Sequence, residues 1–277
     1  MFKLNNGVMM PELGIGTYLI SPADAEICVE KGIKMGYRLV DTANAYGNEK
    51  AVGRAIKNSG VVRDKLFISS KIWVTEYTNP HAVEDTLERL GLDYIDLLFI
   101  HQPSEGYMQA YKQIEKAVKE GKVRAIGISN CEGKYIHDII NNCEILPQVI
   151  QVEAHPYFTQ DDLRKTLEKY NICLMSWYPL GHGDKSLINE QVFKKLADKY
   201  HKTPIQIILR WHIDMGFCVI PGSSNPLHVQ ENFDILDFKL SDEDMKEIAK
   251  INKNKRYYVR TDEMLKHFLS FKPNYEK

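Results

Sequence analysis

The strongest constraint on this sequence is a repeated alternation of short β-rich runs with helix-like stretches. Each run ends in polar residues, and most successive runs are separated by about the length of one βα unit. We predict eight strands, within residues 13–18, 37–42, 66–73, 97–101, 125–130, 149–155, 172–177 and 218–222. Eight units without a break favour an α/β fold of the (β/α)8 type, a TIM barrel, over an open doubly wound sheet with an extra domain.

Helix signals lie between the predicted strands. Gly91 and Gly121 follow amphipathic stretches, where a glycine commonly ends a helix. Pro204 suits a first helical position, and Ser241 with Asp244 forms a capping box. The expected helices include residues 84–89, 107–120, 191–200 and 205–212.

Two segments fall outside the eight units. Residues 1–11 predict a hairpin with its turn at Asn5-Asn6-Gly7, and residues 252–277 form a polar, aromatic-rich tail without clear periodicity. No linker or low-complexity tract interrupts the chain, so we expect residues 1–277 to form a single barrel domain.

Charge and composition exclude several protein classes. The 277 residues carry a net charge of −1, which argues against a dedicated nucleic-acid binder. No apolar run is long enough to span a membrane, and the first residues lack the apolar core of a signal peptide. The five cysteines are widely spaced and form no CxxC pair, so we expect reduced thiols, no metal site and a cytoplasmic location.

Active sites of such barrels form where the strands end. Asp41, Lys71 and His101 lie at the ends of three successive predicted strands, and Tyr46 follows the first of them. Taken singly, Asp41 suits a helix cap, Lys71 a solvated strand end and His101 a core histidine. Together they place an acid, a phenol, an amine and an imidazole at one end of the barrel.

This set of groups suits carbonyl reduction. A phenol has an ordinary pKa near 10, and a cationic lysine beside it lowers that pKa. A carboxylate in contact with the lysine keeps the ammonium charged and fixed, and a histidine can hydrogen-bond a carbonyl oxygen. With a hydride donor alongside, the four groups would protonate an alkoxide as it forms.

Several long motifs resemble the aldo-keto reductase superfamily. They occupy residues 37–49, 71–73, 96–103, 121–130, 151–156 and 220–224, with Glu231-Asn232 beyond them. They cover nearly the whole chain in a fixed order, and they look closest to the short microbial branch related to 2,5-diketo-D-gluconate reductases. The resemblance implies a barrel that uses NAD(P)H without a Rossmann domain. The sequence agrees, because Gly14-Ile15-Gly16 lacks the third glycine of a dinucleotide fingerprint and no P-loop occurs.

The resemblance also assigns site residues. Tyr46 would be the proton donor, Lys71 and Asp41 would tune it, and His101 would orient the carbonyl as a neutral imidazole. The implied cofactor-binding residues are Gly16, Thr17, Asp41, Ser129, Asn130, Gln151, Trp177, Leu180, Gly181, Gly222, Ser223, Ser224, His228, Glu231 and Asn232. The implied substrate-binding residues are Tyr18, Tyr46, Trp73, His101 and Gln102, with Tyr257, Tyr258 and Arg260 of the tail as further wall candidates.

This sequence departs from the family pattern at the cofactor phosphate. Gly222 stands where a lysine is usual and His228 where an arginine is usual, and such cations grip the 2′-phosphate of NADPH. Ser223, Ser224 and a protonated His228 remain as phosphate ligands, so we expect NADPH as the preferred cofactor with NADH also possible. Gly222→Lys should then strengthen NADPH binding selectively. The resemblance also implies that Ser129, Asn130 and Gln151 hold the nicotinamide carboxamide and that Trp177 stacks on the nicotinamide ring. Tyr178 replaces a serine that is common after this aromatic.

The substrate is less well specified. A short loop after His101 and the polar Gln102 suggest an open site for small or hydroxylated aldehydes, ketones and dicarbonyls. We expect a small carbonyl substrate and no nucleic-acid or membrane partner. We expect the protein to be a monomer or a weak dimer. Two alternatives remain open. In a Schiff-base aldolase Lys71 would need a lowered pKa, which Asp41 opposes. The other is a non-catalytic NADP(H)-binding regulatory protein, against which the complete set of four groups argues.

Overall fold

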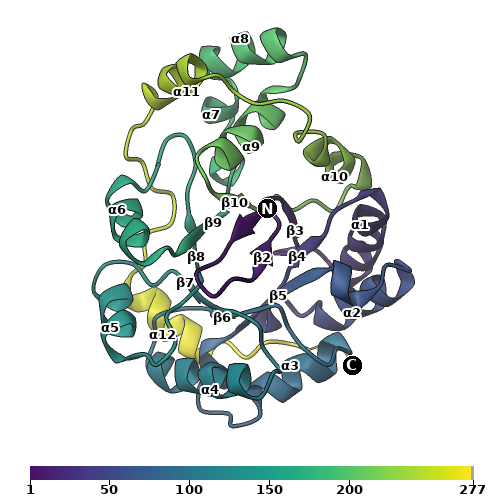
Figure 1. Cartoon of the computed structure of the whole chain (residues 1–277), viewed down its shortest axis with the longest axis vertical. Coiled ribbons are helices and arrows are strands. Elements are labelled where there is room, and N and C mark those ends of the chain that lie inside the picture. The colour runs from purple at the N-terminus through teal and green to yellow at the C-terminus, as the bar shows by residue number, and fades with distance from the viewer. Residues whose placement is uncertain (276–277) are drawn as a thin grey trace.

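Eight parallel strands form the centre of the molecule in a computed structural model that describes residues 1–275 (Figure 1). The strands are β3 (Gly14–Gly16), β4 (Leu39–Asp41), β5 (Phe67–Ile72), β6 (Leu97–Ile100), β7 (Ile126–Ser129), β8 (Val149–Glu153), β9 (Cys173–Trp177) and β10 (Cys218–Val219). Each pairs with its neighbour in chain order. Single bridges join Leu13 to Val219 and Gly16 to Gly222, so the first and last strands meet in a nearly closed barrel. All eight predicted strands and the barrel are confirmed.

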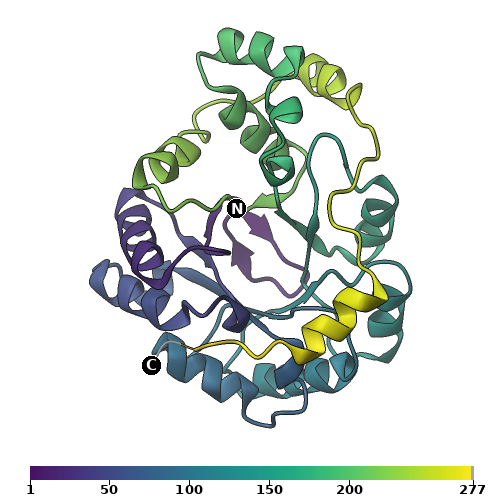
Figure 2. The ribbon, with the colours of Figure 1, turned by 180° about the vertical axis from the view of Figure 1, so that it is seen from behind.

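Helices surround this barrel in both views (Figures 1 and 2). They are α1 (Pro22–Met35), α2 (Glu49–Asn58), α3 (Ala82–Leu90), α4 (Tyr107–Lys119), α5 (Lys134–Asn142), α6 (Asp161–Tyr170), α7 (Lys185–Ile188), α8 (Gln191–Tyr200), α9 (Pro204–Asp214), α10 (Pro226–Phe233), α11 (Asp242–Ala249) and α12 (Asp262–Ser270). The predicted signals act as expected. Gly91 ends α3 with φ of 63°, while Thr203 and Ser241 cap α9 and α11 in capping boxes.

The predicted hairpin is present and closes the amino-terminal end of the barrel. Strands β1 (Phe2–Lys3) and β2 (Met9–Met10) pair in antiparallel fashion around a turn in which Gly7 has φ of 87°. Leu4 and Met10 are buried against the residues that fill this end of the barrel, among them Phe67 and Leu97. Because the hairpin closes the amino-terminal end, small molecules can reach the barrel from the opposite end, where the strands finish. We call this carboxyl-terminal end the mouth.

The tail differs from the sequence expectation. Residues 262–270 form helix α12, capped by Thr261, whose side chain accepts a hydrogen bond from the Met264 N–H. Phe268 of this helix packs edge-on against Trp73, with ring centroids 5.1 Å apart. Contacts with distant residues stabilise a short helix more than its own propensities do, so this helix was not predicted from the local sequence. Figure 2 shows α12 in yellow across the face opposite the hairpin.

Three further features bear on the class of protein. Within the described part of the chain the five cysteines are free thiols. No helix of residues 1–275 is long and apolar enough to cross a membrane. Among the same residues, no group of three or more His, Cys, Asp and Glu side chains has the arrangement of a metal site.

Candidate active site

The four candidate catalytic groups come together at the mouth. Asp41 is the last residue of β4, Lys71 is the last but one residue of β5, and His101 directly follows β6. Tyr46 ends a 3-10 turn, Asn44–Tyr46, that follows β4. Parallel strands end at the same edge of a barrel, so residues far apart in the sequence become neighbours here.

A buried ion pair forms the base of this site. Lys71 Nζ lies 2.5 Å from Asp41 Oδ2 and also donates to the Thr42 carbonyl oxygen at 2.8 Å. The Lys71 side chain is fully buried. Burial lowers the pKa of Lys71, and the Asp41 carboxylate opposes that shift. The expected contact between lysine and carboxylate is therefore present. The expected opposition of Asp41 to a lowered lysine pKa is also present, although the loss of hydration outweighs it.

Tyr46 lies beside this ion pair. Lys71 Nζ is 4.9 Å from the centre of the Tyr46 ring. Desolvation, followed by the negative charge of Asp41, raises the pKa of Tyr46 well above 10. The lowering expected from the neighbouring lysine is thus wrong in net direction, because burial and the charge of Asp41 outweigh it. The tyrosine is consequently a protonated phenol at neutral pH, which is the form that a proton donor needs.

His101 completes the group. Its ring centroid is 5.7 Å from that of Tyr46 and 4.9 Å from that of Trp73. Burial, with a smaller effect from Lys71, lowers the pKa of His101 well below 6.5, so the imidazole is neutral as expected. Its Nδ1 atom has no hydrogen-bond partner within residues 1–275. An unpaired buried polar atom is costly, and this one lies among the proposed reacting groups.

Several supporting contacts were not identified from the sequence. Asp41 Oδ1 accepts hydrogen bonds from Ser69 Oγ at 2.8 Å and from Gln151 Nε2 at 3.0 Å. The Asn48 side chain is buried and donates to the carbonyl oxygens of Thr17 and Ile20. Ser69 lay outside the recognised motifs. Gln151 and Asn48 lay within the motifs at residues 151–156 and 37–49, but the motifs gave no indication of these contacts.

The residues implied to hold a nicotinamide carboxamide lie at neighbouring strand ends. Trp177 is half-buried, and its Nε1–H donates to Asn130 Oδ1 at 3.1 Å. Asn130 Nδ2 lies 3.3 Å from Ser129 Oγ. Gln151 pairs with Ser129 in the β7–β8 register, but its amide donates toward Asp41. The structure thus brings these residues together and links one of them directly to the ion pair.

The first and last strands approach closely at two glycines. A Cβ atom on Gly16 would lie 2.7 Å from the Ile220 carbonyl oxygen, and one on Gly222 would lie 2.7 Å from the Gly16 carbonyl oxygen. Gly222→Lys therefore forces a shift of the backbone, and it is a poor test of cofactor preference. Thr17 is fully buried, and its hydroxyl donates to the Asp41 carbonyl oxygen at 3.1 Å. The Thr17 side chain is therefore engaged in a hydrogen bond within the protein.

The other implied cofactor residues form two groups. Leu180 and Gly181 begin a 3-10 turn after β9, and Gly181 has φ of 59°. The residues implied at the cofactor phosphate lie on the segment after β10 and on helix α10: Gly222, Ser223, Ser224 and His228. The further implied cofactor residues Glu231 and Asn232 lie on the same helix. Ser223 Oγ is 3.4 Å from His228 Nδ1, and His228 is exposed.

The implied substrate wall has an apolar side that includes part of the tail. Trp73 packs against His101, and its Nε1–H donates to the Phe271 carbonyl oxygen at 3.2 Å. Phe268 and Phe271 both contact the Trp73 ring. Neither phenylalanine was predicted, because each is nearly two hundred residues away from Trp73 in the sequence.

The remaining wall candidates are more polar. The Gln102 Oε1 atom lies 3.4 Å from the Tyr258 hydroxyl. Tyr18 is half-exposed, with its ring 5.1 Å from Tyr46 and 6.4 Å from Tyr178. The loop before α4 is short, as expected, yet the tail covers part of the mouth.

Comparisons with known proteins identify the family. The sequence model of the Aldo/keto reductase family matches residues 7–253. The chain belongs to the aldo/keto reductase family. It is 40% identical over 258 residues to methylglyoxal reductase DkgA of Escherichia coli, covering 92% of this chain and 94% of that one. It is 42% identical over 268 residues to glyoxal reductase of Bacillus subtilis, covering 95% and 96%.

Solved structures of aldo-keto reductases show the same fold. The Bombyx mori aldo-keto reductase in complex with NADP superposes with a TM-score of 0.87 at 31% identity, covering 93% of this chain and 94% of that one. The family resemblance inferred from the motifs is confirmed. Family membership supports carbonyl reduction with a nicotinamide cofactor and removes the support for a Schiff-base aldolase.

Proposed function

We propose that this aldo/keto reductase reduces small aldehydes and dicarbonyl compounds to alcohols, with Tyr46 as the proton donor. The observation that carries the proposal is the contact of four groups at the mouth. Lys71 is bound to Asp41 and lies beneath the Tyr46 ring, and His101 faces the same ring. We also propose that residues 1–277 form one domain, active as a monomer or weak dimer.

Tyr46 would donate its proton as negative charge develops on the carbonyl oxygen. Its pKa is raised, so the phenol holds a proton at neutral pH. When the O–H bond breaks, the electron pair stays on the phenol oxygen. The Lys71 ammonium then faces an anion and stabilises it, and Asp41 keeps that ammonium in place. In the oxidation direction, the same phenol oxygen would take the proton from the alcohol.

His101 would orient the substrate. A neutral imidazole carries one N–H, which donates a hydrogen bond to the carbonyl oxygen without competing as a strong acid. Its ring is fixed by edge contacts to Trp73 and Tyr46, so the hydrogen bond has a defined direction. A donor fixed in this way stabilises charge that develops on the oxygen.

The residues at the β7, β8 and β9 ends fit a nicotinamide. Ser129, Asn130 and Gln151 supply the hydroxyl and amide groups that a carboxamide needs, next to the half-buried ring of Trp177. When bound there, the cofactor supplies the hydride. Ser129, Asn130 and Gln151 would hold the carboxamide, and Trp177 would pack on the ring.

We infer NADPH as the preferred cofactor, with NADH also accepted. Ser223, Ser224 and His228 are the groups available to a 2′-phosphate, and two of them are already close together. No fixed lysine or arginine stands at Gly222 or position 228, which weakens discrimination against NADH. The relatives named methylglyoxal reductase and glyoxal reductase support small dicarbonyls as the substrate class.

Carbonyl-dependent oxidation of NADPH and of NADH, measured in parallel, tests the proposal. Methylglyoxal and an aromatic aldehyde serve as substrates. We expect turnover with both cofactors and a higher kcat/KM with NADPH. Tight cofactor binding without any turnover would contradict the proposal and favour a regulatory protein on the same scaffold.

A further inference from the structure

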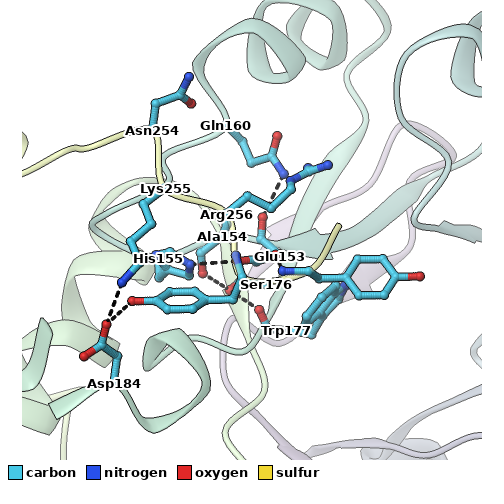
Figure 3. Close-up of polar contacts among 12 residues, drawn as sticks. Glu153, Ala154, His155, Gln160, Ser176, Trp177, Asp184, Asn254, Lys255 and Arg256 are labelled. Carbon is cyan, nitrogen blue, oxygen red and sulfur yellow. Dashed lines mark hydrogen bonds and ion pairs between the residues drawn. The ribbon is translucent and has the colours of Figure 1, made fainter. Parts of the chain in front are cut away.

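Part of the motif at residues 151–156 has no role in the proposed chemistry. Gln151 contacts Asp41, whereas the Glu153 side chain binds His155 and the tail (Figure 3). The tail segment 252–260, between α11 and α12, passes across this position, and we call it the strap. The contacts of Glu153 with the strap therefore indicate its role.

Glu153 binds the strap through its main chain. Its carboxylate accepts hydrogen bonds from the Tyr257 N–H at 2.7 Å on Oε1 and from the Tyr258 N–H at 2.8 Å on Oε2. His155 Nε2 lies 3.0 Å from Oε1 (Figure 3). The Glu153 side chain is only 1% exposed. Two consecutive N–H groups need one acceptor each, and a carboxylate supplies both.

A second carboxylate binds the strap from the other side. Asp184 accepts hydrogen bonds from the Tyr257 hydroxyl and from Lys255 Nζ (Figure 3). The Tyr257 ring lies against Gly181, where an added Cβ would come within 3.1 Å of it. Tyr257 is thus held at its main chain by β8 and at its side chain by the turn after β9.

The residues just beyond this point contact the candidate nicotinamide site. Tyr258 packs edge-on against Trp177, with ring centroids 5.4 Å apart, and its hydroxyl is 3.4 Å from Gln102 Oε1. Arg260 Nη1 donates to the Asn130 carbonyl oxygen at 3.0 Å. Asn130 and Trp177 are themselves hydrogen-bonded. Displacement of the strap would therefore release both of these residues at once.

We propose that Glu153 is a positioning residue that acts through the strap, holding Tyr258 and Arg260 so that Trp177 and Asn130 are preset to receive the nicotinamide. This inference rests on the proposed function for its catalytic consequence, but the anchoring of the strap stands independently of it. Glu153 touches neither substrate nor cofactor in this account.

The first experiment compares Glu153→Gln with the unmodified protein by amide hydrogen exchange of residues 252–260. An amide side chain keeps the size but offers one acceptor oxygen, so one of the two strap N–H groups loses its partner. We expect exchange at Tyr257 and Tyr258 to accelerate about tenfold. We expect the Kd for NADPH, measured by quenching of tryptophan fluorescence, to rise about threefold or more.

Glu190→Gln is the matched control. Glu190 is also a carboxylate that binds the strap, through Lys253 Nζ at 3.1 Å, and it accepts a hydrogen bond from the Tyr157 hydroxyl. It makes no contact with the Tyr257 and Tyr258 N–H groups. Exchange at those two amides and the Kd for NADPH should therefore stay unchanged in this variant.

Tyr258→Leu and Tyr258→Phe give a second route if Glu153→Gln does not fold. Leucine removes the ring from Trp177 and should weaken NADPH binding, whereas phenylalanine keeps the ring and should restore it. Faster exchange in Glu153→Gln with an unchanged Kd would mean that the strap is only structural, and would overturn the proposal. Unchanged exchange would overturn the anchor itself. Both readouts remain valid even if no carbonyl is turned over, so this failure is distinct from a failure of the proposed function.

Discussion

At the scale of single residues, burial decides the protonation of the site. The sequence placed Asp41, Tyr46, Lys71 and His101 at the barrel mouth, because strand ends and motif positions can be read from spacing. It gave the wrong direction for the pKa of Tyr46, because desolvation depends on what surrounds the ring. The structure has a protonated phenol next to a buried ammonium and a neutral imidazole.

These directions predict the pH dependence of carbonyl reduction. Tyr46 must be protonated to act, and its pKa is raised, so activity should fall only above about pH 10. His101 must be neutral to act, and its pKa is lowered, so the enzyme should keep its activity down to about pH 6. We expect kcat/KM for methylglyoxal to be nearly constant from about pH 6 to about pH 9. A decline centred near pH 8 would instead show that the Lys71 ammonium outweighs burial in setting the pKa of Tyr46.

At the scale of elements, the pattern of apolar and polar residues predicted the eight barrel strands and several of the helices. Each strand is a short apolar run that ends in polar residues, and glycine, proline and capping residues marked the helices. Helix α12 was missed because its stability comes from Trp73, far away in the sequence. The strap was missed for the same reason, since the acceptors on Glu153 and Asp184 are visible only once the chain is folded.

The hairpin provides a stability prediction at this scale. Met10 is fully buried at the closed end of the barrel, whereas its neighbour Met9 is 46% exposed. Met10→Ala should lower the free energy of unfolding by about 2–5 kcal/mol, because it leaves a cavity in the packed end. Met9→Ala, the matched control, should change it by less than about 0.5 kcal/mol. Urea denaturation gives both values, and equal losses would contradict the role of the hairpin as a plug.

At the scale of the whole molecule, closure of the barrel brings its first and last strands together at one site. The bridge between Gly16 and Gly222 places the segment before α10 next to the first strand. Once a barrel was assumed, the motif positions predicted that these two segments are neighbours. They did not predict that the two backbones approach closely enough to exclude a side chain at Gly222. This close approach makes His228, which is exposed, a better position than Gly222 for testing cofactor preference.

His228→Arg should strengthen the binding of NADPH and leave that of NADH unchanged. Arginine is always charged and binds phosphate oxygens in a bidentate manner, and only NADPH carries a 2′-phosphate. We expect a gain of about threefold to tenfold in NADPH affinity at low ionic strength, reduced by added salt. Equal gains for both cofactors would place the 2′-phosphate elsewhere.

The central claim is that Tyr46 donates the proton in carbonyl reduction, and its removal is the most direct test. We would measure methylglyoxal-dependent oxidation of NADPH by Tyr46→Phe, with NADPH affinity determined on the same sample. Tyr170→Phe, at the end of α6 beside the hairpin, controls for the loss of a phenol elsewhere. We predict that kcat falls by about 10²–10⁴ in Tyr46→Phe alone, with the Kd for NADPH unchanged. Retention of more than about one tenth of the activity would contradict the claim.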